Sequence, residues 1–218
     1  MVEPMNPSSQ RRLVRWGGAA AVAGGVYSLV IATIYAVTRV GARGDRLFGS
    51  LDPLLFPAPA LFTLSLVIFR VRYGKDVAQI GRLGLALAIL GMILVTFGQF
   101  GFSFLGFTRS GNYSIGPGML CVELGLLVFA VSAARGHKLP RRMWVLPFLM
   151  TVLPVLVIAA SQVVALLQGS RLLSIDDIYF QGLYVAWAVL WIVLGVLLWF
   201  EGKLSHDLVA KVCSETSL

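Results

Sequence analysis

The feature that most constrains this chain is a series of six apolar runs, each about as long as a helix needs to be to cross the hydrocarbon layer of a bilayer. They cover residues 16–39, 53–70, 83–107, 115–134, 144–167 and 179–200. Runs this long lack the alternation of barrel strands, and backbone polar groups in lipid must be satisfied within their own segment. The sequence therefore predicts an all-α integral membrane protein with six transmembrane helices in a compact bundle.

The composition agrees with this class and argues against a nucleic-acid-binding protein. The 218 residues are 58% hydrophobic and 13% charged, which is too apolar for a soluble domain of this length. The net charge of +8 comes from short clusters of Lys and Arg between the apolar runs, and not from a basic face on one soluble surface. We therefore expect the lipid bilayer, and no nucleic acid, as the partner of the chain.

The same basic clusters predict an orientation in the membrane. The N-terminal segment, the connections at 70–82 and 135–142 and the C-terminal tail together hold 13 Lys and Arg, whereas the opposite side holds five. Because cytoplasmic connections carry the excess of Lys and Arg, we predict a multi-pass protein of the cell membrane with both termini cytoplasmic. Its predicted parts are a cytoplasmic segment at 1–15, the transmembrane domain at 16–203 and a short, frayed tail at 204–218.

The predicted helix ends at the cytoplasmic boundary share one pattern. The second, fourth and sixth runs each end in a glycine that is followed closely by lysine: Gly74, Gly136 and Gly202. Glycine is a natural left-handed cap, and the cation complements the negative end of the helix dipole. Amphipathic rings favour this boundary too, and it carries Trp16, Trp144 and Trp199. The pattern is compatible with three outward hairpins, each made of two consecutive helices.

Small residues recur every seven positions in three of the runs. These stripes are Gly18, Gly25 and Ala32 in the first run, Gly84, Gly91 and Gly98 in the third, and Gly118, Gly125 and Ser132 in the fourth. This spacing keeps small residues on one seam of a left-handed helix pair and lets the backbones approach closely. We expect the seams to pack the bundle or to join it to a partner, either a second copy of the chain or another membrane protein.

One carboxylate stands alone in the apolar runs. Glu123 lies near the middle of the fourth run, and no other acid lies between Asp76 and Asp176. An ionisable group in lipid costs roughly 2.5–3.5 kcal/mol on insertion scales, so it is by default a functional-site hypothesis. The predicted topology places further polar side chains on the same, external side. The resulting candidate ligand-binding pocket consists of Glu123, Gln99, Gln162, Gln181, Tyr35 and Tyr184.

Two interpretations of Glu123 remain open. In the first, Glu123 forms the floor of an externally accessible pocket that binds a cation, a proton or the amine of a ligand. In the second, Glu123 is protonated and hydrogen-bonded to a neighbour such as Gln99 or Gln162, and it holds helices together. The small-residue stripe of its own helix lies roughly opposite Glu123, so we expect that helix to be buried on two sides.

The residues required by several membrane chemistries are missing from the apolar runs. Both histidines, His137 and His206, lie in predicted cytoplasmic segments, so none is placed to ligate a haem or to serve an intramembrane hydrolase as base. No lysine lies within a run, and the sequence contains no HExxH motif, Cys/His cluster or Walker loop. We therefore predict no catalytic residues, no metal and no cofactor, and we do not expect an enzyme.

These observations lead to two main functional hypotheses, and a third, an enzyme that acts on lipids or quinones of the outer leaflet through scattered polar groups, stays open. The first is an accessory, assembly or interaction subunit of the membrane, which is supported by short connections, few membrane charges and the small-residue stripes. The second is a small transporter or ligand-binding carrier with an externally facing pocket around Glu123. Prolines within or beside the second and fifth runs support the second hypothesis, because broken helices and buried acids mark the sites of many transporters.

Overall fold

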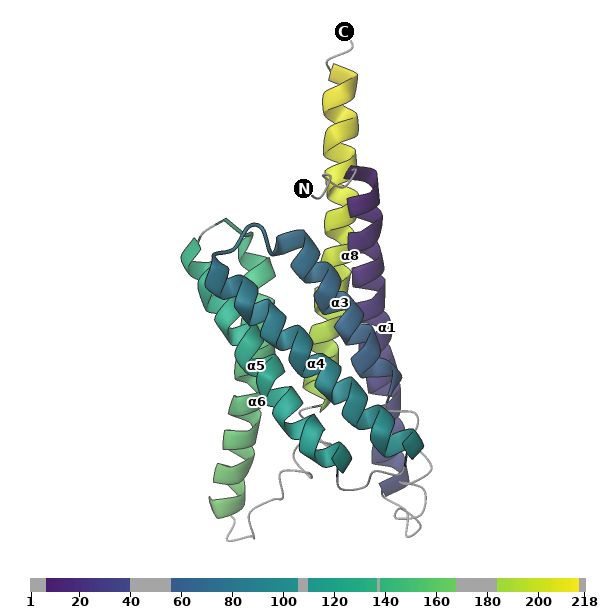
Figure 1. The fold of residues 1–218 in the computed structure, drawn as a ribbon, viewed down its shortest axis with the longest axis vertical. Coiled ribbons are helices and arrows are strands. Elements are labelled where there is room, and N and C mark those ends of the chain that lie inside the picture. Colours follow the sequence, from purple (N-terminus) through teal and green to yellow (C-terminus); the bar gives the residue numbers. More distant parts are fainter. Residues whose placement is uncertain (1–6, 40–55, 106–109, 137, 168–183, 216–218) are drawn as a thin grey trace.

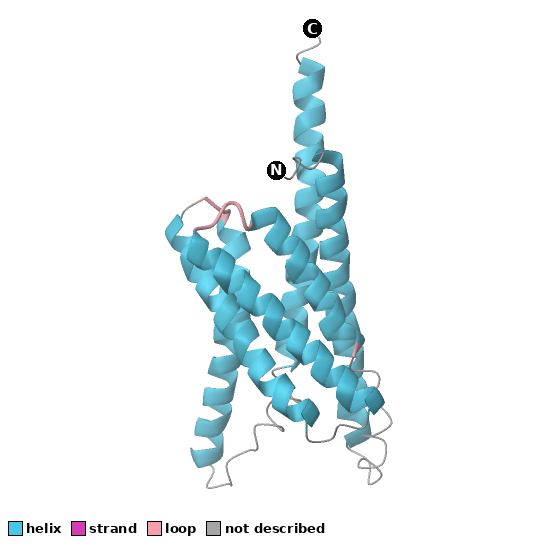
Figure 2. Cartoon of the chain, in the orientation of Figure 1, coloured by secondary structure: helices cyan, strands magenta, loops and turns pink. Residues whose placement is uncertain are grey.

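The computed structural model describes residues 7–39, 56–105, 110–136, 138–167 and 184–215, and nearly all of these residues are helical. The described helices are α1 (Pro7–Arg39), α3 (Pro57–Tyr73), α4 (Gln79–Leu105), α5 (Ser110–Gly136), α6 (Arg141–Leu167) and α8 (Tyr184–Glu215). Figure 2 shows them, with turns described between α3 and α4 and between α5 and α6. Within the described residues, three segments are long and apolar enough to cross a membrane: Ser8–Ile34, Gln79–Leu105 and Ser114–Gly136. The all-α prediction is confirmed, and these three segments are compatible with membrane insertion.

Each helix corresponds to one predicted apolar run, but several extend beyond it. α1 begins at Pro7, well before the run at 16–39. α8 continues to Glu215 and so includes most of the tail that was predicted to be frayed at 204–218. Polar residues after Gly202 do not end the helix, because they include good helix formers and no proline. A hydropathy boundary therefore marks where the apolar sequence ends, and not where the helix ends.

The predicted left-handed glycine caps are not present at the three helix ends. Gly136 is the last residue of α5, whereas α8 runs straight through Gly202. Gly74 ends α3 with φ −59° and ψ −26°, and its N–H donates to the carbonyl oxygen of Arg70 at 2.8 Å. The prediction of a left-handed cap at Gly74 is wrong, because right-handed helical hydrogen bonding continues to this residue.

The helices run alternately up and down, so that α1 begins and α8 ends at the same end of the bundle (Figure 1). We call this the terminal end. The α3–α4 and α5–α6 connections lie at this end as well, and α8 projects beyond it. α3 lies between two groups of helices, since it contacts both α1 and α4. The fold is therefore a pair, α1 with α8, joined through α3 to a group formed by α4, α5 and α6.

The most extensive helix contact is between α4 and α5, and glycines make it close. A Cβ added to Gly91 would lie 2.4 Å from the carbonyl oxygen of Gly118. One added to Gly125 would lie 2.5 Å from the carbonyl oxygen of Gly84. Side chains at these positions would force the backbones apart. The seams predicted for the third and fourth runs are confirmed as packing surfaces, and they face each other.

A second glycine contact joins α1 to α8. A Cβ on Gly18 would lie 2.6 Å from the carbonyl oxygen of Gly195, and one on Gly25 would lie 2.7 Å from that of Ala188. α8 contacts α1 far more extensively than it contacts α6. Of the three predicted hairpins, α4 with α5 is the most closely packed, α1 contacts α3 as well, and α6 and α8 contact each other least. The small residues that complement the seam of α1 lie on α8.

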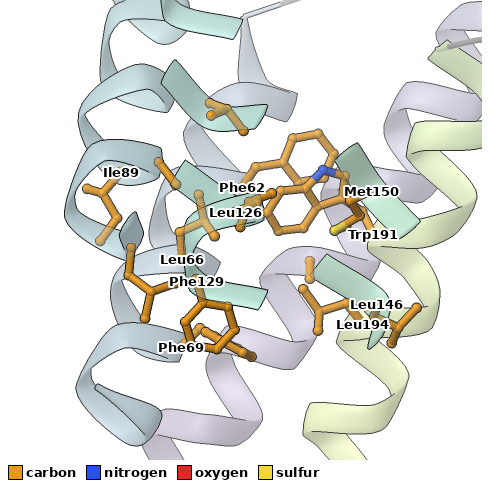
Figure 3. Close-up of a cluster of buried hydrophobic side chains, with 14 of the residues drawn as sticks. Phe62, Leu66, Phe69, Ile89, Leu126, Phe129, Leu146, Met150, Trp191 and Leu194 are labelled. Carbon is orange, nitrogen blue, oxygen red and sulfur yellow. The ribbon is translucent and has the colours of Figure 1, made fainter. Parts of the chain in front are cut away.

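Aromatic side chains fill the core where these groups meet (Figure 3). Phe62 of α3 stacks on Trp191 of α8 with 4.4 Å between ring centroids, and it meets Trp187 edge-on at 5.2 Å. Two turns further along α3, Phe69 packs edge-on against Phe129 of α5 at 5.3 Å. One face of α3 therefore holds α8 at one point and α5 at another.

Candidate functional site

The structure describes the side chains of two of the six residues predicted to form a pocket. Gln99 of α4 and Glu123 of α5 are both partly buried. The other four side chains lie outside the described part of the chain: Gln181 together with its backbone, and Tyr35, Gln162 and Tyr184 within helices whose backbone is described. The geometry of the predicted pocket can be followed only for the first two.

The packing of α4 on α5 places Gln99 and Glu123 at different depths. A Cβ on Gly91 would lie 2.7 Å from the backbone nitrogen of Val122, so Glu123, the next residue, is level with Gly91. Gln99 lies eight residues beyond Gly91 on α4, which is about 12 Å further along at the helical rise per residue. The contact between α4 and α5 therefore does not bring these two side chains together.

Gln99 belongs instead to a short polar strip between α3 and α4. Thr96, three residues earlier and on the same face, has its Oγ1 3.3 Å from the Oγ1 of Thr63 on α3. The Thr96 hydroxyl also lies 2.7 Å from the carbonyl oxygen of Met92. The Gln99 Oε1 is buried and has no hydrogen-bond partner among the described residues. Because buried polar atoms are rarely left without a partner, this oxygen can accept a bond from a ligand or from water.

A charged cluster ties α3 to α8 at the terminal end. The Tyr73 hydroxyl donates to Oε2 of Glu201. The Arg72 guanidinium lies 3.7 Å from Oε1 of Glu201 and 3.8 Å from Oδ2 of Asp76. It also lies over the Tyr73 ring, 5.0 Å from the centroid. Glu201 is therefore engaged by two side chains of α3, and its charge is directed to that side of α8.

Because of the Tyr73 hydroxyl, the free energy of unfolding should fall at alkaline pH. Burial raises the pKa of Tyr73 above its ordinary value of 10.0, and the hydrogen bond and charge of Glu201 raise it further. The folded state therefore retains a proton that the unfolded state loses. The resulting stabilisation is fully present below pH 10 and is lost as the pH rises above this value.

We expect Tyr73→Phe to lower the free energy of unfolding at pH 7 by about 1.5–3 kcal/mol, because the partly buried Glu201 loses a charged hydrogen bond. Above pH 10 the difference between the two proteins should shrink, since the parent protein alone loses this contribution. Thermal unfolding in mild detergent, followed by circular dichroism from pH 7 to pH 11, measures both effects. Parallel stability curves for parent and variant across this range would contradict the assignment.

A groove of 310 Å³ opens between α1 and α8 at the same end. α1 lines it with Arg12, Arg15, Trp16 and Ala19, whose spacing places them on one face of the helix. α8 contributes Trp199. The guanidinium of Arg15 lies over the Trp199 ring, 4.8 Å from the centroid. We call these five residues the Arg–Trp groove.

The small residues of α1 explain why this groove exists. A Cβ on Gly18 would lie 2.9 Å from the backbone nitrogen of Trp199, so the two backbones touch beside the groove. Ala19 supplies only a methyl group to the lining. No carboxylate is among the described lining residues, and Glu201 is held by Tyr73 and Arg72 of α3. The groove is therefore basic and aromatic.

The sequence indicates the members of this groove but not the groove itself. Trp16 and Trp199 are predicted at the same membrane boundary, and Arg12 and Arg15 contribute only to the predicted orientation. Nothing in the sequence states that α1 packs on α8. One feature of the sequence does point to the groove, namely predicted depth in the membrane. A tryptophan with neighbouring arginines begins one apolar run, and another tryptophan lies at the end of a second run on the same side.

The rest of the described chain offers no stronger site. Among the described residues, no three His, Cys, Asp or Glu side chains gather closely enough to hold a metal ion. Comparison with protein-family models, with curated proteins and with solved structures gave no significant match to this chain. Conclusions about its function therefore rest on the exposure, packing and charge of its own residues.

Proposed function

We propose that this chain is a multi-pass protein of the cell membrane, with six transmembrane helices and both termini cytoplasmic, and that it serves as an accessory, assembly or interaction subunit. The observation that carries the membrane assignment is that large apolar side chains are exposed on each of the described helices. Examples are Val30, Leu64, Phe97, Leu124, Leu156 and Val193. Soluble monomers rarely expose contiguous apolar surface on this scale, whereas lipid solvates it.

The orientation is supported by the arrangement of the helix ends. The start of α1, the end of α8 and the α3–α4 and α5–α6 connections share the terminal end of the bundle. These are the same four segments that hold 13 of the 18 Lys and Arg. Because basic segments are retained in the cytoplasm, the terminal end is assigned to the cytoplasmic side.

The interaction role is supported by the small number of charged side chains, and the lack of a recognisable catalytic set, in the apolar runs. The glycine faces of Gly91, Gly125, Gly18 and Gly25 are occupied by helices of the same chain. A second copy or another membrane protein would therefore pack on the exposed apolar faces. Purification in a mild detergent, followed by mass measurement by light scattering, tests this role. A strictly monomeric particle without a stoichiometric partner would contradict it.

Thiol labelling tests insertion and orientation together. In a chain with Cys121→Ser, the native Cys213 of the tail should resist a membrane-impermeant maleimide in intact cells and react after lysis. Asn112→Cys, placed in the connection predicted to be external, should react in intact cells when Cys213 is replaced by serine. The protein should stay in the membrane pellet after alkaline carbonate treatment. Labelling of Cys213 in intact cells would contradict the orientation, and release by carbonate would contradict insertion.

A second function, a small transporter or ligand-binding carrier, is favoured by one observation. The Gln99 Oε1 is buried without a described partner, on the same face of α4 as Thr96, whose hydroxyl contacts that of Thr63. In this hypothesis Glu123 supplies the charge of a pocket that is completed by side chains outside the described part.

The replacement Glu123→Gln tests the carrier hypothesis. If Glu123 exchanges protons with a pocket, proton- or cation-dependent uptake into vesicles should be abolished while the protein still folds. If Glu123 is protonated and only joins helices, glutamine should preserve both stability and behaviour, because it can make similar hydrogen bonds. Thermal stability at several pH values serves as the folding control. Identical yield, stability and uptake in both proteins at every pH would rule out the carrier site.

A further inference from the structure

We propose that the Arg–Trp groove binds the headgroup of an anionic phospholipid, with Arg12 and Arg15 holding its phosphate. The inference rests on the proposed membrane insertion, and it deepens that proposal by naming a specific lipid contact. The groove lies at the terminal end of the bundle, where α1 and α8 run side by side (Figure 1). In the proposed orientation this end meets the headgroups of the cytoplasmic leaflet.

The donors in the groove suit a phosphate. The guanidinium carbon of Arg15 lies over the Trp199 ring, 4.8 Å from the centroid, and one such contact does not occupy all five N–H donors of a guanidinium. Arg12 lies about one turn away on the same face of α1 and lines the same groove. Arginine binds phosphate oxygens through two parallel N–H donors, and this geometry is stronger than a single contact. Two such side chains, with no described carboxylate beside them, form an anion site.

The indole rings suit the position of a headgroup. Trp16 exposes 70% of its surface, and tryptophan is enriched where one part of a side chain meets acyl chains and another meets the polar layer. With Trp199 it supplies apolar walls for the glycerol and ester region of a lipid. The arginines therefore lie beside groups that can hold the uncharged part of the same molecule.

The size and charge of the groove select this occupant. A volume of 310 Å³ is at the lower end of small-molecule sites, which suits one headgroup and excludes a folded domain. A second copy placed symmetrically on the groove would bring four arginines together, which like-charge repulsion opposes. The same two charges disfavour a choline headgroup, whose ammonium they would repel. An anionic phospholipid satisfies all three conditions.

Native mass spectrometry can test the proposal on the whole purified chain. The protein in mild detergent is incubated with equal amounts of phosphatidylglycerol and phosphatidylcholine that carry the same acyl chains. We expect the parent protein to retain phosphatidylglycerol preferentially. The double replacement Arg12→Gln with Arg15→Gln should lower this preference on the order of 10- to 30-fold, because each basic residue near a membrane surface contributes about fivefold. Trp16→Ala, at an exposed position, should lower it several-fold.

A matched control separates the site from general charge. Arg135 and Arg141 are exposed, lie at the ends of α5 and α6 near the terminal end, and do not line the groove. Replacing both by glutamine removes the same net charge, and the lipid preference should stay within about twofold of the parent, since these charges do not contact the bound headgroup. Circular dichroism of every variant checks that the bundle has folded. Equal losses in the two double variants would overturn the proposal.

Two further measurements distinguish a bound lipid from a bound phosphate compound, and a failure of this inference from a failure of the proposed function. Millimolar inorganic phosphate carries the charge without acyl chains, and we expect it to leave the lipid bound. Displacement of the lipid by inorganic phosphate would assign the groove to a free phosphate compound and overturn the lipid proposal. Carbonate extraction on the same membranes reports insertion separately. An inserted protein without lipid preference would overturn this inference alone, whereas a carbonate-extracted protein would overturn the proposed function and this inference with it.

Discussion

Replacing Gly91 by leucine will prevent α4 and α5 from reaching their native contact and will lower the free energy of unfolding by more than about 3 kcal/mol. A Cβ at this position would already lie 2.4 Å from one backbone oxygen and 2.7 Å from a backbone nitrogen of α5. Neither atom can rotate away as the end of a side chain could. Overpacking of a core commonly costs about 1–3 kcal/mol, and more when the backbone must shift. We expect Gly91→Ala to fall within that range.

The matched control is Gly116→Ala. Gly116 is exposed on α5, and apart from its chain neighbours and the nearby backbone of its own helix no atom lies within 4 Å of the Cβ that alanine would add. Alanine should keep the stability within about 1 kcal/mol of the parent, because the gain from replacing glycine in a helix interior is opposed by crowding between the new Cβ and Pro117. Equilibrium unfolding in mixed micelles of mild detergent and dodecyl sulfate, followed by circular dichroism, ranks the three variants. A Gly91→Leu protein as stable as the parent would show that α4 and α5 are not held by this seam.

The second large effect is expected at Trp191. Its side chain is completely buried and packs between Phe62 and Trp187, with ring centroids at 4.4 and 5.6 Å. Trp191→Ala should lower the free energy of unfolding by about 3–5 kcal/mol, as is typical when a large aromatic residue is removed from a packed core. The loss should loosen α8 from α3, because Phe62 then faces a cavity where the indole stood.

Trp191→Phe should be far milder than Trp191→Ala. The Trp191 Nε1 is buried with no partner among the described residues, and an unsatisfied buried donor costs about 1–3 kcal/mol. Phenylalanine keeps a ring against Phe62 but fills less space than the indole, and it removes the unsatisfied donor. The loss of packing and the gain from removing the donor therefore partly cancel. Phe200→Ala, at a half-exposed position on the same helix, should be nearly neutral. The same unfolding assay applies, and equal losses for the alanine and phenylalanine variants would contradict the stacking argument.

The helices were predictable from the sequence because each coincides with a long apolar run, and the length and apolar content of such runs are those of membrane helices. The runs at 83–107 and 144–167 lie within a few residues of α4 and α6. The largest deviations are at Pro7 and Glu215, where helix propensity and tertiary contacts decide the boundary and hydropathy has no bearing on it. The small-residue seams were predictable too, because a seven-residue period defines one face of a helix.

The neighbours of each seam were not predictable in the same way. A periodic pattern identifies the face that packs, but it carries no information about which helix meets that face. Gly18 faces Gly195, from the opposite end of the chain, and an expectation based on consecutive hairpins misses this pair. The Arg–Trp groove depends on the same pairing of α1 with α8. The sequence therefore indicates its residues singly and not the groove that they form together. For the predicted pocket, helix order and depth alone could not show that Gln99 and Glu123 lie at different levels.

The pairing of α1 with α8 also has a consequence for how the protein is made. Under the proposed membrane insertion, helices enter the bilayer in the order of synthesis, so α1 would reside in lipid while its seam, Gly18 and Gly25, still lacks Gly195 and Ala188. Contacts between distant parts of a chain form late, and a surface that remains uncovered until then can associate with the wrong partner. α8, which is translated after the other described helices, is thus the one that covers this face of α1. Ribosome stalling or truncation before α8 would leave the Gly18 and Gly25 face of α1 without its partner and, under the proposed insertion, exposed to quality-control proteases of the membrane.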